Sequence, residues 1–262
     1  MRHRVLGVIP ARLGSSRLPR KPLHPIAGRP LVEWVWRRAV DFGLFDAVVV
    51  ATDSAEVADA ARAFGAEVAM TRAEHPSGTD RVAEVARMEP WRGYGVVVNV
   101  QGDEPFLRHD HVEAALGLVT VGGWEIGTVA TPIASDAEWR EESVVKVVRG
   151  DDGGALLFTR APAPHPRDAE PDFESGLYLR HVGLYAYTRD ALLRWVALPE
   201  GALERTEKLE QLRPLAAGVR IGVAVGSPAE GGVDTPADAA RAEALLRKMS
   251  EDHNPTLERA RT

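Results

Sequence analysis

The first half of the chain alternates short apolar runs with longer segments in which apolar residues recur every three to four positions. Short runs rich in valine and isoleucine are typical of buried strands, and the longer period is typical of amphipathic helices. The expected strands are residues 5–9, 47–51, 67–71, 95–100 and 126–132, and the expected helices are residues 31–42, 55–64, 79–89 and 109–119. Strands that alternate with helices predict βαβ units, so we expect an α/β fold with a mostly parallel sheet flanked by helices.

Beyond residue 132 the pattern becomes less regular. We expect strands at residues 144–148, 155–159, 180–188 and 219–225, and helices at residues 190–196, 203–211 and 236–249. The proline-rich stretch 161–171 shows little periodicity and is interpreted as a loop or lid. The last residues, 251–262, are polar and are interpreted as a tail.

The composition excludes several classes of protein. The chain has 262 residues, no cysteine and a formal net charge of -6. Without cysteine there are no disulfides and no thiolate metal ligands, which fits the reducing cytoplasm, where we expect the protein to reside. No apolar run approaches the ~20 residues of a membrane span, and the acidic balance argues against a broad nucleic-acid surface. We therefore expect no membrane and no nucleic-acid partner, and a small anionic ligand for a local cluster of cations.

Such a cluster directly follows the first expected strand, in the loop at residues 10–23. Its cations are Arg12, Arg17, Arg20 and Lys21. Gly14, Ser15 and Ser16 lie among them and allow a tight turn, while prolines stiffen the backbone. Arginine, lysine and backbone N–H groups all bind phosphate oxygens, so the loop is a candidate polyphosphate site. It matches neither the P-loop pattern nor the dinucleotide G-x-G-x-x-G pattern, and a solvated basic loop is the alternative interpretation.

Two acidic segments are candidates for a metal site. The run 96–100 leads into Gln101-Gly102-Asp103-Glu104, where carboxylates at a strand end suit Mg²⁺ that is shared with substrate phosphates. The alternative is a turn that caps the next helix. Asp234 follows the last expected strand and is interpreted as the cap of the C-terminal helix or, if the fold brings it near Asp103, as a second carboxylate on the same metal ion.

Other segments carry candidate binding residues. Ser77 and Gly78 stand where a helix is expected to begin, and they could contact a nucleobase or phosphate or only cap the helix. His181, Gly183, Tyr185 and Tyr187 alternate along one face of an expected strand. That face could bind a sugar, with a structural histidine as the alternative. Glu204, Glu207, Glu210 and Gln211 lie on or near one expected helix, with a solvated face as the alternative, and Arg160 could bind a substrate carboxylate.

Seven motifs, taken in order, resemble the 3-deoxy-manno-octulosonate cytidylyltransferase family, whose members are also called CMP-KDO synthetases. They are PARxxSxRLPxKPL at 10–23, TRxxHxSGTxR at 71–81, NVQGDEP at 99–105, VKVV at 145–148, RHxGxYxY at 180–187, LExxExLEQLR at 203–213 and GVDTPxD at 232–238. The motifs are spread over nearly the whole chain. GDEP alone is shared more widely among nucleotidyltransferases, whereas the ordered set is specific to this family.

The resemblance implies transfer of CMP from CTP to the anomeric hydroxyl of 3-deoxy-D-manno-octulosonate (KDO). This gives CMP-KDO and pyrophosphate for lipopolysaccharide biosynthesis, with Mg²⁺ as the cofactor. It also implies one Rossmann-like, glycosyltransferase-A-like nucleotidyltransferase domain over residues 1–250, followed by the polar tail 251–262. Within the domain, residues 133–215 would form an insertion for sugar binding and dimerisation, so a homodimer is expected.

Residue by residue, the resemblance implies four catalytic positions, of which the two aspartates bind Mg²⁺. They are Arg12, Lys21, Asp103 and Asp234. The positions implied for CTP are Arg12, Ser15, Ser16, Arg17, Lys21, Ser77, Gly78 and Gln101. The positions implied for the sugar acid are Gln101, Arg160, His181, Tyr185, Glu210 and Gln211.

The chain departs from the family pattern in three places. Arg20 stands where the phosphate loop commonly has glycine, residues 161–165 lack the usual Ile-Pro-Trp, and Arg205-Thr206 replaces the more usual His-Ile pair. Two other functions are kept as alternatives. One is a cytidylyltransferase for a related sugar acid, such as 8-amino-KDO or a sialic acid, and the other is a non-catalytic module that binds nucleotide sugars.

Overall fold

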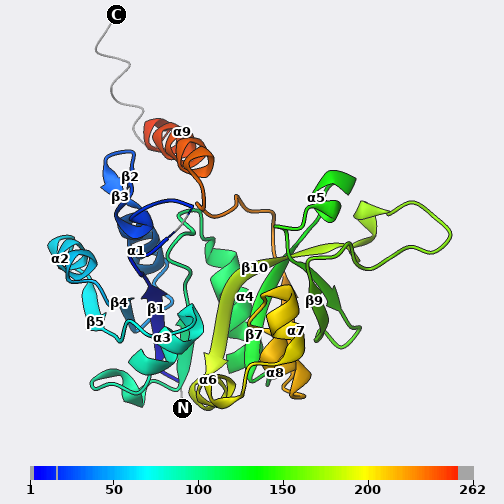
Figure 1. Ribbon diagram of the computed structural model, residues 1–262, viewed down its shortest axis with the longest axis horizontal. Helices are drawn as coiled ribbons and strands as arrows, with labels where there is room; N and C mark the ends of the chain where they lie inside the picture. Colours follow the sequence, from blue (N-terminus) through cyan, green and yellow to red (C-terminus); the bar gives the residue numbers. More distant parts are fainter. Residues whose placement is uncertain (1–2, 16, 253–262) are drawn as a thin grey trace, which may run out of the picture.

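The computed structural model describes residues 3–15 and 17–252. Its central sheet contains β1 (Val5–Pro10), β4 (Ala47–Thr52), β5 (Glu67–Met70), β6 (Val96–Asn99), β7 (Ile126–Pro132), β8 (Lys146–Arg149), β9 (Ala155–Thr159), β10 (Leu179–Thr188) and β11 (Ile221–Val225). The main path runs β11-β7-β10-β6-β1-β4-β5, with β8 paired to β10 and β9 paired to β8. Figure 1 labels β5, β4, β1, β10, β7 and β9 of this sheet. On this path only β10 runs antiparallel to its neighbours, which confirms the mostly parallel sheet.

Helices cover both faces of this sheet. They are α1 (Leu31–Asp41), α2 (Ala55–Ala63), α3 (Gly78–Val85), α4 (His109–Thr120), α5 (Asp136–Arg140), α6 (Arg189–Ala197), α7 (Ala202–Glu207), α8 (Leu212–Ala216) and α9 (Pro236–Asp252). None of these described helices is long and apolar enough to cross a membrane.

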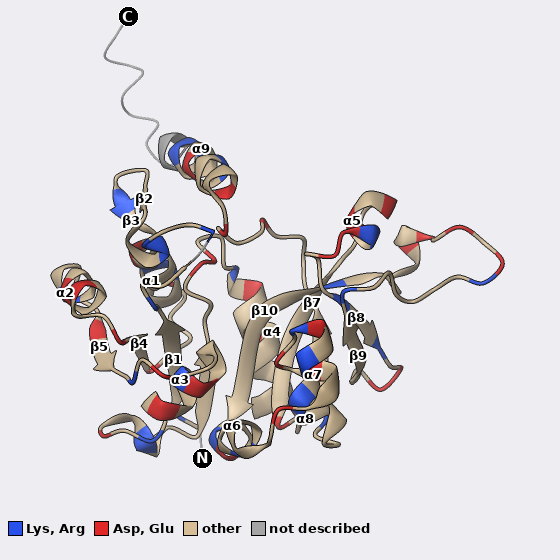
Figure 2. Ribbon diagram, in the orientation of Figure 1, with Lys and Arg blue, Asp and Glu red and all other residues tan. Residues whose placement is uncertain are grey.

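The alternation of side chains along β1 shows how the two layers form. Val5 and Ile9 pack in a core cluster with residues of α1, α2 and α4. Leu6 and Val8 pack in a second cluster with residues of α3, α6 and α8. The central strands carry few charges, whereas the charged segments lie mainly on helices and loops (Figure 2). Burial of apolar side chains on both faces therefore stabilises the parallel strands.

The C-terminal helix α9 packs at the edge of the sheet where β1 and β6 end. Its apolar residues Ala239, Ala242 and Leu246 share a core cluster with Leu18 and with Phe106. This cluster also includes Ile26 of the short hairpin formed by β2 (Pro25–Ile26) and β3 (Arg29–Pro30). The packing places the start of α9 beside the loops that follow β1 and β6 (Figure 1).

Several expected boundaries are wrong. The single helix expected at 203–211 is broken, because Lys208 adopts a left-handed conformation with φ 55° after α7 ends. Glu210 and Gln211 therefore lie in the turn before α8. The helix expected at 79–89 ends at Val85. Residues 251 and 252, expected in the tail, belong to α9, and the rest of the expected tail lies outside the described residues.

Two glycines test the packing of α4 against β7. A Cβ on Gly127 would lie 2.6 Å from the carbonyl oxygen of Ala115, whereas a Cβ on Gly117 would meet nothing within 4 Å. We expect Gly127→Ala to lower the free energy of unfolding by about 1–3 kcal/mol, because the helix must move away from the strand. Gly117→Ala should raise the free energy of unfolding by about 0.5–1 kcal/mol, because glycine inside a helix such as α4 is less stable than alanine. Urea unfolding of both variants measures the difference, and equal effects would contradict this packing.

Candidate active site

Two adjoining cavities lie at the edge of the sheet where β1 and β6 end. These two strands are parallel neighbours, so the loops that follow Pro10 and Asn99 meet there. The first cavity has a volume of about 370 Å³ and the second about 230 Å³. Gly78, Gln101 and Glu210 line both cavities and therefore mark their junction.

The first cavity gathers most of the residues expected to bind CTP. Those that line it are Arg12, Ser15, Arg17, Lys21, Ser77, Gly78 and Gln101. The expected metal ligands Asp103 and Asp234 line the same cavity. The cationic loop after β1 thus forms one wall of a cavity. Arg20 is turned away from this group and pairs with Glu56 of α2. Ser16 lies outside the described residues.

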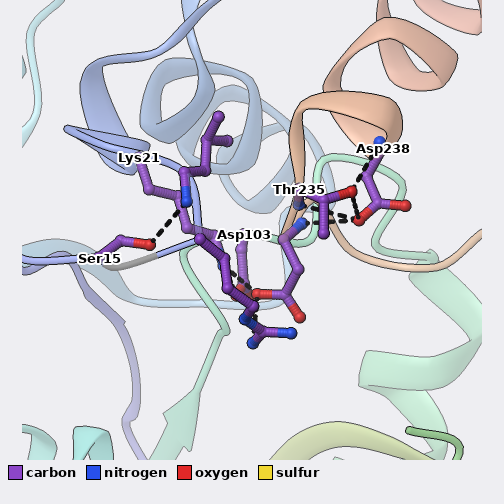
Figure 3. Close-up of polar contacts among 8 residues, drawn as sticks. Ser15, Lys21, Asp103, Thr235 and Asp238 are labelled. Carbon is purple, nitrogen blue, oxygen red and sulfur yellow. Dashed lines mark hydrogen bonds and ion pairs between the residues drawn. The ribbon is translucent and has the colours of Figure 1, made fainter.

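Lys21 is the centre of a charged cluster in the first cavity (Figure 3). Its Nζ donates a hydrogen bond to Asp103 Oδ2 and lies 2.8 Å from Asp234 Oδ1. Arg17 adds a second cation, 3.1 Å from Asp234 Oδ1. Burial lowers the pKa of Lys21, but the negative charges of Asp103 and Asp234 outweigh burial and hold the pKa above its usual value. The two carboxylates therefore converge on one positive charge.

Short backbone contacts position these groups. A Cβ on Gly102 would lie 2.6 Å from the carbonyl oxygen of Pro10, so only glycine lets the ends of β1 and β6 approach this closely. Asp103 follows directly, and its carbonyl oxygen accepts a hydrogen bond from Val233 N at 2.8 Å. This bond ties the loop after β6 to the segment that carries Asp234.

The interpretation of Asp234 as a helix cap is wrong. Thr235 Oγ1 accepts a hydrogen bond from Asp238 N at 3.2 Å, and Asp238 Oδ2 accepts one from Thr235 N at 3.0 Å. These reciprocal bonds form a capping box at the start of α9 (Figure 3). The carboxylate of Asp234 is consequently available to Lys21 and Arg17. The alternative that Asp103 and Glu104 form a turn capping the next helix is also wrong, since α4 begins after Arg108 without a side-chain cap.

Two polar side chains of the first cavity were not singled out from the sequence, those of Arg81 and His75. Arg81 is buried, lies 3.2 Å from Asp53 and also bonds Thr71. His75 is held by Glu84. Both belong to the motif at 71–81, where the spacing of a histidine and an arginine around Ser77-Gly78 is the signal that could have identified them. Ser77 itself caps α3, since its Oγ accepts a hydrogen bond from Asp80 N.

The second cavity gathers most of the residues expected to bind the sugar acid. Those that line it are Gln101, His181, Tyr185, Glu210 and Gln211. Asn99 Oδ1, Tyr185 Oη and Gln211 Nε2 are buried there without a hydrogen-bond partner among the described residues. Unpaired buried polar atoms are costly unless a ligand or water satisfies them. The cavity is therefore suited to a ligand with several polar groups.

Arg160 lies outside the residues that line these two cavities. Its Nε donates to the carbonyl oxygen of Glu207 at 2.9 Å, and its Nη1 donates to that of Glu142 at 3.0 Å. The expected contact of Arg160 with a substrate carboxylate stays a prediction. Glu207 accepts from Thr159 and from Arg160 N, and Glu204 pairs with Arg213, so neither glutamate belongs to a merely solvated face.

Glu104 is a further carboxyl group beside the charged cluster. Burial, followed by the charge of Asp103, raises the pKa of Glu104 to about 8. Burial also raises the pKa of Glu210 at the junction of the cavities. Both side chains are thus disposed to hold a proton at a pH where exposed carboxyl groups are ionised.

Comparison with known proteins agrees with this geometry. A family model described as cytidylyltransferase matches residues 6–221. The 3-deoxy-manno-octulosonate cytidylyltransferase of Gemmatimonas aurantiaca is 51% identical over 239 residues, which are 91% of this chain and 92% of the relative. The enzyme of the same name from Syntrophotalea carbinolica is 46% identical over 253 residues, which are 94% of this chain and 99% of the relative.

A solved structure agrees with both relatives. The structure of CMP:2-keto-3-deoxy-manno-octonic acid synthetase complexed with CTP superposes with a TM-score of 0.86 at 43% identity, and the match covers 94% of this chain and 99% of that chain. The fold and the family model define a nucleotidyltransferase of the cytidylyltransferase class. Within that class, the chain belongs to the 3-deoxy-manno-octulosonate cytidylyltransferase family.

The raised pKa of Glu104 predicts a pH-dependent stability. The folded state favours the neutral form of Glu104. The contribution of Glu104 to the free energy of unfolding is therefore complete below the unfolded pKa of about 4.3 and is lost as pH rises toward about 8. Wild-type protein should lose up to about 1.4 kcal/mol of unfolding free energy per pH unit within that window. Glu104→Gln mimics the neutral form, so this pH-dependent loss should be absent in the variant. Urea unfolding at several pH values measures it, with exposed Glu230→Gln as the control. Parallel stability profiles for Glu104→Gln and the wild type would contradict the assignment.

Proposed function

We propose that this protein transfers CMP from CTP to the anomeric hydroxyl of KDO and releases pyrophosphate, supplying CMP-KDO for lipopolysaccharide biosynthesis. The observation that carries the proposal is the pair of adjoining cavities. The first cavity is lined by Lys21 of the cationic loop and by the carboxylates of Asp103 and Asp234. The second cavity contains buried polar atoms that have no hydrogen-bond partner among the described residues. A nucleotide and a sugar acid bound in these cavities would meet at their junction beside Gln101 and Glu210.

The residues of the first cavity suit a triphosphate. We propose that Arg12, Arg17 and Lys21 bind its phosphate oxygens together with the backbone near Ser15 and Ser16, because fixed cations offset charge that a phosphoryl transfer must accommodate. Gln101, Ser77 and Gly78 would contact the rest of the nucleotide. The reaction is a direct displacement at the α-phosphorus, so these residues act by orientation and charge, without a covalent enzyme intermediate.

The donor set also fits Mg²⁺. Asp103 and Asp234 converge on the single charge of Lys21, so their oxygens are already arranged around a cation. Among the described residues there is no group of three histidine or acidic side chains able to hold a metal ion. Two carboxylates leave positions for water and phosphate oxygens, as Mg²⁺ prefers. When bound there, Mg²⁺ would offset the repulsion between the sugar carboxylate and the phosphates and would activate the attacking hydroxyl.

The second cavity would bind the sugar acid. We propose that Gln101, His181, Tyr185, Glu210 and Gln211 contact its polar groups, since they line this cavity. Arg160 is kept as a candidate for the carboxylate.

Two wider expectations stay predictions. A cytoplasmic location is one of them, and the absence of cysteine fits it. The homodimer expected from the family would use residues 133–215, where Leu156 and Leu203 are exposed large apolar side chains.

The proposed reaction predicts a specific pyrophosphate release. Purified protein with Mg²⁺ should release pyrophosphate with CTP and KDO, and a chelator should abolish the release. ATP, GTP and UTP replace CTP as controls, and 8-amino-KDO and N-acetylneuraminic acid replace KDO. Release with another sugar acid alone would move the specificity to that substrate. Binding of CTP without release for each of the three sugar acids would favour a non-catalytic module and contradict the proposal.

A second prediction concerns Lys21. Lys21→Gln removes the charge from the phosphate site and leaves Asp103 and Asp234 without their shared counter-charge. We expect kcat/KM for CTP to fall about a hundredfold or more, as for other preorganised charges in active sites. Lys248→Gln, which alters an exposed lysine on α9, is the matched control. Near-wild-type kcat/KM for Lys21→Gln would contradict the role of Lys21.

A further inference from the structure

Thr128 of β7 lies beneath an irregularity in the neighbouring strand β10. The pairing of these strands shifts between Val182 and Tyr185, with Tyr185 opposite Thr128. Thr128 is fully buried at 0% exposure. Its Oγ1 lies 2.7 Å from the carbonyl oxygen of Leu184 and 3.0 Å from Nε2 of His181. One hydroxyl therefore contacts both the backbone of the irregular segment and an imidazole.

The number of protons fixes the direction of both hydrogen bonds. A hydroxyl has one hydrogen to donate, and a carbonyl oxygen can only accept. Leu184 O, at 2.7 Å, is nearer than the other carbonyl acceptor, Val182 O at 3.4 Å. Thr128 Oγ1 therefore donates to Leu184 O and accepts from His181 Nε2–H. Burial lowers the pKa of His181 to about 3, so the ring is neutral and carries one N–H group. If that proton is on Nε2, then Nδ1 carries a free lone pair.

The ring of His181 is held in place from two sides. Phe158 contacts it edge-on with ring centroids 5.1 Å apart, and Tyr185 lies at 5.2 Å. His181 lines the second cavity, and the described residues provide no hydrogen bond to its Nδ1. Nδ1 is thus a fixed acceptor in a cavity that is suited to a polar ligand.

We propose that Thr128 is a positioning residue that holds His181 in the Nε2–H tautomer, so that Nδ1 accepts a hydrogen bond from a hydroxyl group of the sugar acid. This inference deepens the proposed function and rests on it for the identity of the ligand. An acceptor at this point favours a hydroxyl donor and disfavours a group that can only accept, because such a group would leave two lone pairs facing each other.

The tautomer can be measured without substrate. In protein labelled with ¹⁵N-histidine, long-range ¹H–¹⁵N spectra distinguish the two neutral tautomers, and the His181→Gln variant identifies the signals of His181. We expect a single Nε2–H pattern in the wild type between about pH 6 and 8. Thr128→Val, which keeps the shape without the hydroxyl, should lose this preference, and Thr128→Ser should keep it. An Nδ1–H pattern in the wild type would overturn the inference, whether or not the valine variant folds.

Kinetics test the consequence for the substrate. In Thr128→Val we expect KM for KDO to rise about tenfold, as for the loss of one hydrogen bond, while KM for CTP changes by less than about twofold. Thr128→Ser should restore KM for KDO. An unchanged KM for KDO in the valine variant would overturn the inference. The two failures are distinguishable, because absence of CMP transfer in the wild type overturns the proposed function, whereas the tautomer is read from the free protein.

Discussion

The ammonium group of Lys21 joins three segments that are far apart in the sequence. It contacts Asp103 in the loop after β6 and Asp234 before α9, while its own backbone belongs to the loop after β1. Removal of both carboxylates would leave the partly buried ammonium group of Lys21 without compensation, and this is more costly than the loss of a surface ion pair. The arrangement of the first cavity therefore depends on this one charge and its two carboxylates.

Apolar packing brings these three segments together. Leu18, Phe106 and Val233 lie close in sequence to Lys21, Asp103 and Asp234 respectively, and all three are buried in one core cluster. Residues of α9 complete that cluster, so the C-terminal helix fixes the edge of the sheet at which the cavity lies. This apolar packing thus links the hydrophobic core to the charged cluster, since a shift of α9 would carry Asp234 away from Lys21.

The sequence predicted most of this fold because its signals were local. Apolar runs identified the parallel strands, and strand ends led to Lys21, Asp103 and Asp234. Other features depend on contacts that no local pattern reveals. The break of the helix at Lys208 needs a left-handed lysine, which periodicity does not show. The cap of α9 is a different case, because the local pattern Thr235-x-x-Asp238 was present in the sequence and indicates Thr235 rather than Asp234. The contact between Thr128 and His181 depends on a shift in strand register.

We propose that Asp103 and Asp234 share one divalent cation in the presence of CTP. Electron paramagnetic resonance of Mn²⁺, used in place of Mg²⁺, measures free and bound metal directly in a titration with the protein and CTP. We expect one tight site in the wild type, beyond the Mn²⁺ that CTP alone binds, and we expect this site to be lost or strongly weakened in both Asp103→Asn and Asp234→Asn, while both variants stay folded. Binding of Mn²⁺ by both variants with wild-type affinity would contradict it.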